Sequence, residues 1–294
     1  MSEQSQPVVV GVDGSQLART AAVWAAGEAR RRGTGVRIVA VVPGGPVAGA
    51  DWEAFPNDIA ADFAAGGREH AEAARSDVAE HDPQLPVTAA VVEGWPAEAL
   101  VRESRETERL VLGARGMGEL GGVVVSSTSE AVVSHAQCPV AVIRREHGAE
   151  SSGAPVVVGL DGSSYGRAVM AEACAAASAR GAEVLALRAW SDIGFHEAGE
   201  PVAALWRKRR GGDQEALDEE LAPWRTRFPD LAIRAELVRD RPAHALLHRS
   251  GRAQLVVVGG RGRGGFPGMQ LGSTARVLVH ACQCPLLVVP PGAS

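Results

Sequence analysis

The sequence of 294 residues lacks the features that mark several classes of protein. Aromatic residues make up only 4%, so Val, Leu and Ala must fill the core, as in parallel α/β folds. No apolar run approaches the ~20 residues that span a bilayer, and MSEQSQP lacks the basic and apolar regions of a signal peptide. A net charge of −5 argues against nucleic-acid binding, which usually needs a basic excess. We therefore expect a cytoplasmic protein.

Cysteine and histidine patterns do not indicate a metal site. Cys282 and Cys284 are two apart, and no second pair completes a zinc site. His244 and His248 share the face of an expected helix without an apparent third ligand. We expect buried structural thiols, with a redox role as the alternative.

The chain contains an internal duplication. VVVGVDGS at residues 8–15 returns as VVVGLDGS at residues 156–163, an offset of 148. Later in the chain the offset is 146, which matches Gly113 with Gly259. A whole-domain duplication explains this spacing better than a short solenoid repeat. We place the domains at residues 1–148 and 149–294, joined by a polar linker.

Each half alternates apolar strands with helical patterns, which predicts a mainly parallel sheet with helices on both faces. Strands are expected at residues 8–12, 36–42, 87–92, 109–112 and 140–144, then at 156–160, 184–189, 233–238, 255–258 and 286–289. Helices are expected at residues 16–32, 58–81, 97–105, 127–136 and 163–180. The second of these helices contains Gly66-Gly67, where we expect an interruption.

A glycine-rich loop follows the fourth strand of each half. In the second half, residues 256–274 predict a strand, a loop and the start of a helix, with the sequence VVVGGRGRGGFPGMQLGST. Such loops bring backbone N–H groups against an anion and often need positive φ, and a helix N-terminus adds its positive dipole end. In the matching residues 110–128, Ser126 stands where Gly272 would be. At positive φ the backbone of this serine would be strained. At negative φ its hydroxyl could help to bind the phosphate.

Two aspartates are expected to meet these loops. Asp13 and Asp161 leave the first strand of each half, and in a doubly wound sheet that strand neighbours the fourth at the switch point, where ligands bind. Carboxylates suit a ribose hydroxyl or a metal-bound water, whereas Arg115 and Arg261 suit phosphate. The structural alternative is a set of tight turns, with Ser273 capping a helix.

Two common nucleotide motifs are missing. No Gly-Lys-Ser/Thr follows either glycine loop, so the P-loop is absent. The pattern GxGxxG does not follow the first strand. Dinucleotide-dependent redox chemistry is therefore not expected.

The loops together resemble the universal stress protein family. Its nucleotide-binding members carry G-x2-G-x9-G-[ST], which the second loop matches completely and the first matches except at Ser126. The resemblance implies two tandem five-stranded sheets of order 3-2-1-4-5. It further implies that each crevice binds ATP, with or without Mg²⁺. It also implies adenine near Val41 and Ala189, and pairing through the fifth strands as a homodimer or an intrachain pseudo-dimer.

The candidate nucleotide-binding residues are Asp13, Gly14, Ser15, Val41, Gly113, Arg115, Gly116, Ser126, Ser127 and Thr128 in the first half, and Asp161, Gly162, Ser163, Ala189, Gly259, Arg261, Gly262, Gly272, Ser273 and Thr274 in the second. We expect both sites to bind ATP, and the second site matches the family motif better than the first.

Three functions remain open at this point. The sequence favours an ATP-binding stress-response module that signals through its bound state. A slow ATPase or phosphotransferase in the same crevices is the alternative, although no catalytic base or Walker lysine is apparent. A scaffold that no longer needs nucleotide is the third. The basic cluster at residues 206–210 is expected to be a solvated helix face or a loop.

Overall fold

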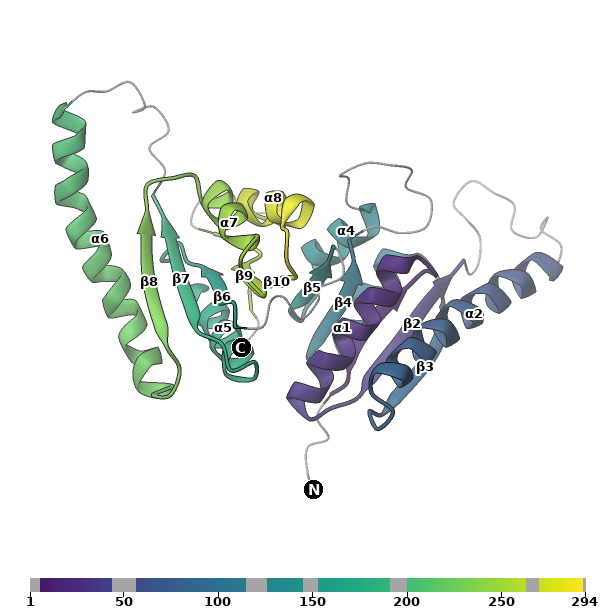
Figure 1. Cartoon of the computed structure of the whole chain (residues 1–294). Helices are drawn as coiled ribbons and strands as arrows, with labels where there is room; N and C mark the ends of the chain where they lie inside the picture. The colour runs from purple at the N-terminus through teal and green to yellow at the C-terminus, as the bar shows by residue number, and fades with distance from the viewer. Residues whose placement is uncertain are drawn as a thin grey trace. The chain divides into compact units, whose positions relative to one another are not determined.

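The computed structural model describes residues 6–43, 57–114, 126–144, 153–190, 200–262 and 270–292. The chain divides into two compact units, the first ending at Glu146 and the second beginning at His147. Figure 1 shows that each unit consists of a sheet flanked by helices. Within the described residues, no helix is both long enough and apolar enough to cross a bilayer.

The first unit is a parallel, doubly wound sheet. Its elements are β1 Val8–Val12, α1 Gln16–Arg32, β2 Val36–Val42, α2 Asn57–His81, β3 Val87–Glu93, α3 Pro96–Glu103, β4 Arg109–Gly113, α4 Ser127–His135 and β5 Val140–Ile143. The strand order β3-β2-β1-β4-β5 confirms the expected 3-2-1-4-5. Helices α1 and α2 pack together, as do α3 and α4, which fits right-handed crossovers on opposite faces.

The second unit repeats this arrangement. Its elements are β6 Val156–Gly159, α5 Gly166–Ser178, β7 Val184–Ala189, α6 Glu200–Arg227, β8 Ile233–Val238, α7 Pro242–Ser250, β9 Leu255–Gly259, α8 Ser273–Ala281 and β10 Leu286–Val289. The strands run parallel in the order β8-β7-β6-β9-β10. The basic cluster at residues 206–210 lies within α6.

Local sequence explains the boundaries of α1. Every residue of β1 is buried, as expected for a strand with helices on both faces. The Ser15 hydroxyl accepts the Ala18 N–H and so caps the N-terminus of α1. Gly33 ends the helix at φ 68°, a left-handed conformation that glycine adopts readily.

The expected interruption at Gly66-Gly67 is wrong, because α2 runs unbroken through both glycines. A Cβ added at Gly67 would lie 2.5 Å from Cγ1 of Val42, whereas one added at Gly66 would meet nothing within 4 Å. Gly67 therefore lets α2 approach the sheet closely. The sequence pattern could not distinguish this packing role from a helix break.

The four cysteines are buried and form no disulfide with one another. Burial raises the pKa of the Cys174 thiol to about 11. The Sγ atoms of Cys282 and Cys284 lie 3.8 Å apart, and this contact together with burial raises the pKa of Cys284. Raised pKa values keep both thiols protonated and unreactive at neutral pH, as a structural role requires.

Candidate functional site

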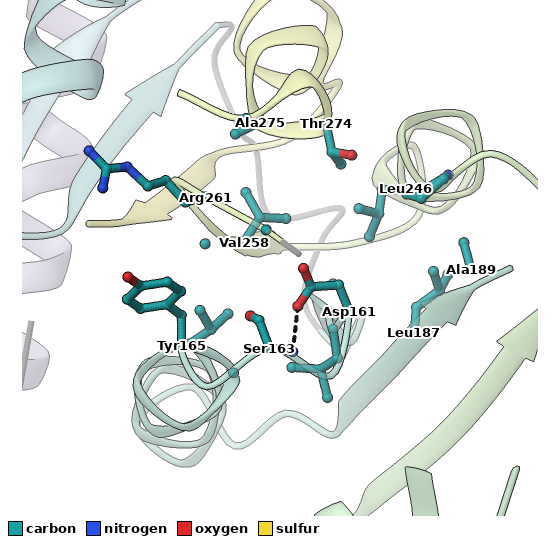
Figure 2. Close-up of a pocket in the computed structure, with 18 of the residues that line it drawn as sticks. Asp161, Ser163, Tyr165, Leu187, Ala189, Leu246, Val258, Arg261, Thr274 and Ala275 are labelled. Carbon is teal, nitrogen blue, oxygen red and sulfur yellow. Dashed lines mark hydrogen bonds between the residues drawn. The ribbon is translucent and has the colours of Figure 1, made fainter. Parts of the chain in front are cut away.

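A cavity of about 330 Å³ opens in the second unit where β6, β7 and β9 end. The strand order reverses between β6 and β9, so this is the switch point of the sheet. Figure 2 shows Arg261 and Tyr165 at one end of the cavity and Leu187, Ala189 and Leu246 at the other, with Asp161 between them.

The turn after β6 fixes the carboxylate of Asp161. Oδ1 of Asp161 accepts the Ser163 N–H at 2.9 Å. Between these residues Gly162 takes φ 71°, a conformation that disfavours a side chain. The turn thus holds the carboxylate beside the cavity, which Asp161 and Ser163 both line.

The glycines of the loop after β9 are required by close contacts and not by backbone conformation. The expectation of positive φ is wrong for Gly259 and Gly262, neither of which adopts it. A Cβ added at Gly262 would lie 2.6 Å from Oδ2 of Asp161. A Cβ at Gly259 would lie 3.0 Å from the Arg261 carbonyl oxygen and 3.3 Å from Val169. The loop therefore approaches the β6 turn as closely as a glycine backbone allows.

Helix α8 begins at the cavity. Gly272 is its N-cap at φ −67°, and its N–H donates to the Gly260 carbonyl at 2.7 Å. No side chain in the described residues caps this helix. Ser273, Thr274 and Ala275 of its first turn line the cavity. Uncapped N–H groups and the positive end of the helix dipole suit a bound anion.

The opposite end of the cavity is apolar. Leu187 and Ala189 contribute from β7, Val258 from β9, and Pro242 and Leu246 from α7. An apolar surface beside a carboxylate and a set of N–H donors can accommodate a ligand with a flat apolar part and an anionic part.

Arg261 lies at the polar end of the cavity. Its Nε atom is buried and makes no hydrogen bond within the described part of the chain. A buried guanidinium nitrogen without a partner is costly unless an acceptor reaches it. This cost favours an anionic ligand at that end.

The first unit contains a corresponding cavity of about 300 Å³. Asp13, Val41, Gly113, Ser126, Ser127 and Thr128 of the predicted site line it. Arg115 and Gly116 lie outside the described residues. A Cβ added at Gly113 would lie 3.3 Å from backbone atoms of Leu17 and Ala18, so this glycine lets β4 approach α1.

Ser126 is not strained. It adopts φ −64° and ψ 144°, nearly the conformation of Gly272 at φ −67° and ψ 154°. The left-handed conformation considered for this position does not occur. A Cβ at Gly272 would meet protein atoms no closer than 3.5 Å, so the fold tolerates either residue here.

Three of the predicted site residues that the structure describes do not line the cavities. Gly14, Ser15 and Gly162 instead shape the turns that position Asp13 and Asp161. Gly14 takes φ 84° and Gly162 takes φ 71°.

Sequence reasoning missed several lining residues, among them Pro96, Leu100 and Ser129 in the first unit and Tyr165, Pro242 and Leu246 in the second. Pro96 and Leu100 repeat as Pro242 and Leu246 at the offset of 146. That repetition was the available signal.

Comparison with known proteins identifies the family. The model of the universal stress protein family matches residues 4–144 and again residues 154–290. The chain belongs to the universal stress protein family. Each structural unit corresponds to one match, so the chain is a tandem member with two family domains.

Relatives with the same tandem length support this assignment. The universal stress protein Rv1996 of Mycobacterium tuberculosis is 37% identical over 299 residues, covering 96% of this chain and 94% of its own. A universal stress protein of Mycolicibacterium smegmatis is 33% identical over 290 residues, covering 97% of each chain. A crystal structure of a universal stress protein from Archaeoglobus fulgidus aligns with a TM-score of 0.68 at 18% identity, covering 98% of this chain and 100% of its own. That likeness supports the fold alone.

Proposed function

We propose that this universal stress protein binds adenine nucleotides, ATP foremost, and serves the stress response as a nucleotide-dependent binding module. The observation that carries the proposal is the cavity of the second unit. There the Asp161 turn, the Gly259–Gly262 loop and the start of α8 meet around one space with an apolar far end. The complete G-x2-G-x9-G-[ST] motif of the second half supports it further.

The order of chemical groups along the cavity suggests how a nucleotide would lie. Adenine would contact the apolar end at Leu187, Ala189 and Leu246. The ribose hydroxyls would donate to the carboxylate of Asp161. The phosphates would then reach Arg261 and the N–H groups of α8.

The same cavity would hold the substrate of the alternative activity, slow ATP hydrolysis or phosphotransfer. Within its described lining Asp161 is the only carboxylate, and the turn beside Gly262 fixes its position. Its placement suits ribose binding better than activation of a water near the terminal phosphate. We therefore propose binding as the principal function, and pairing of units through the fifth strands remains a prediction.

Titration calorimetry with ATP tests the proposal. We expect Ala189→Trp to remove binding by the second unit because the indole fills the apolar end. Ala189→Ser, which leaves the space open, is the matched control and should retain binding. Mass spectrometry of the purified protein should reveal a retained adenine nucleotide. If the wild-type protein neither retains nor binds one, the proposal fails in favour of a scaffold.

Hydrolysis is tested separately by single-turnover release of ADP. A rate abolished by Asp161→Ala with ATP binding retained would establish the enzyme instead. If the protein is a binding module, Asp161→Ala should weaken ATP affinity, and no ATP hydrolysis should depend on this residue.

A further inference from the structure

The two crevices differ in whether their hydrogen-bond donors are already used. Each lies at the switch point of its own unit, and each is bounded by an aspartate turn and a helix start. In the first unit, a serine hydroxyl accepts one backbone N–H at the start of α1 and one at the start of α4. In the second unit the corresponding groups make no such bonds within the described residues.

The first difference is at the start of the fourth helix of each unit. Oγ of Ser126 accepts the Ser129 N–H at 3.1 Å and lies 2.9 Å from Oγ of Ser129, which donates to the Gly113 carbonyl at 2.9 Å. In the second unit Gly272 and Ala275 occupy these two positions. That exchange removes the side-chain acceptor and leaves the first turn of α8 without a side-chain cap.

The second difference is at the aspartate turns. The Ser15 hydroxyl donates to Oδ1 of Asp13 at 2.7 Å and accepts the Ala18 N–H at 3.2 Å. Ser163 occupies the same place in the second unit and lines the cavity, but its hydroxyl makes no hydrogen bond within the described structure. Helix α5 starts later, after Tyr165, and likewise has no side-chain cap.

These differences act in the same direction. The helix starts of α5 and α8, the Ser163 hydroxyl and the buried Nε of Arg261 are all donors awaiting an acceptor in the second unit. A polyphosphate supplies many anionic acceptors at once. In the first unit the Ser126 hydroxyl already accepts the Ser129 N–H and the Ser15 hydroxyl already accepts the Ala18 N–H, so a phosphate at these two donors must displace a serine side chain.

We infer that the two crevices select different ligands: the second takes a nucleoside polyphosphate, and the first takes a nucleoside or nucleoside monophosphate. Ser126 and Ser129 are then the residues that determine this preference in the first unit. The inference rests on the proposed adenine-nucleotide function and assigns a separate substrate class to each site.

The test measures each site alone. Ala189→Trp blocks the second crevice and Val41→Trp blocks the first, since these residues line the two cavities at equivalent positions. Ala189→Phe and Val41→Phe are smaller blocking substitutions if a tryptophan variant fails to fold. Dissociation constants for ATP, AMP and adenosine are measured by calorimetry at fixed salt and Mg²⁺.

We expect the second site to prefer ATP to AMP by at least about tenfold, the effect of one hydrogen bond to a charged group. The first site should bind adenosine and AMP as well as it binds ATP. The paired substitutions Ser126→Gly and Ser129→Ala should raise ATP affinity in the first unit about tenfold relative to adenosine affinity. The reverse exchange, Gly272→Ser with Ala275→Ser, should lower ATP affinity in the second unit.

Equal ATP-to-AMP ratios at the two sites would overturn the inference, as would an exchange that changes adenosine and ATP affinity alike. A first site that binds none of the three ligands beside a second site that binds ATP would also overturn it. If neither site binds any of them, the proposed function itself fails, which is a distinguishable outcome.

Discussion

Gly262 and Asp161 are in contact across the crevice of the second unit: a Cβ added to the glycine would lie 2.6 Å from Oδ2 of the aspartate. These residues are 101 positions apart in the sequence and follow neighbouring strands. Because of this contact, the position of the carboxylate depends on the absence of a side chain at residue 262. A change at either should affect nucleotide binding through the other.

Gly262→Ala should weaken ATP binding at the second site at least about tenfold. The added methyl group must push the carboxylate aside, and the far end of a side chain can move without unfolding the protein. The midpoint of thermal unfolding should therefore change little. Calorimetry in the Val41→Trp background measures the affinity of this site alone.

A double-mutant cycle separates this mechanism from a direct phosphate clash. If Gly262→Ala acts by displacing Asp161, then combining it with Asp161→Ala should lower ATP affinity little more than Asp161→Ala does alone. Additive losses would show that Gly262 contributes independently of the carboxylate.

Gly67→Ala and Gly66→Ala should change stability in opposite directions although they are adjacent in α2. A methyl group at Gly67 would overlap Val42, so we expect a loss of about 1–3 kcal/mol. At Gly66 there is open space, and alanine should stabilise the helix by about 0.5–1 kcal/mol. Urea unfolding of the two variants compares them directly. Equal effects would mean that Gly67 does not pack against β2.

The contrast between these glycines indicates what the sequence could and could not predict. Alternating apolar and helical patterns were enough for a parallel sheet and for most element boundaries, because burial on both faces dictates Val-rich strands. The strand order came from the resemblance to the family. The role of Gly67 depends on the distance between α2 and Val42, which no local pattern encodes.

The candidate site follows the same rule. Asp161, Gly262 and the start of α8 could be predicted, since the switch point brings the ends of two known strands together. Leu246 and Tyr165 could not be derived from the loop motif, because they reach the cavity from α7 and from the turn before α5. The hydrogen bonds of Ser126 could not be predicted from the sequence either, because they depend on the rotamer that the side chain adopts in the fold.

The buried pair of Glu28 and Arg109 should tolerate joint replacement better than single replacement. Arg109 is fully buried and 2% of Glu28 is exposed, and Nη1 of the arginine donates to Oε1 of the glutamate. Arg109→Met alone leaves a buried carboxylate that still contacts Arg32 at 3.1 Å and Arg31, three positions along the helix, at 3.7 Å, and should cost about 3–5 kcal/mol. Glu28→Leu combined with Arg109→Met should recover most of that loss.

Urea unfolding of the single and double variants measures this coupling. A double variant as unstable as the sum of its singles would mean that the pair contributes no coupling energy. The expectation has support within the chain, because Ala176 and Leu255 occupy the equivalent positions of the second unit.

The cysteine thiols should resist alkylation in the folded protein. Burial raises the pKa of Cys174 from 9.0 to about 11, and the pKa of Cys284 is also raised. Since the thiolate is the reacting species, iodoacetamide at pH 8 should modify neither residue until urea unfolds the chain. Raising the pH to 9 should not change this, because it remains below the folded pKa of Cys174. Rapid native labelling of Cys284, mapped by mass spectrometry, would contradict the structural role.

The different cores of the two units also bear on how a duplicated chain folds. Near-identical halves can exchange elements during folding, and tandem repeats are prone to such misassembly. If α5 docked onto the first sheet in place of α1, Arg109 would face Ala176 and bury its guanidinium without the carboxylate of Glu28. That exchange would cost several kcal/mol, of the order of a broken buried ion pair. A charge pair that is present in the first unit and absent at the equivalent positions of the second thus disfavours docking of α5 onto the wrong sheet.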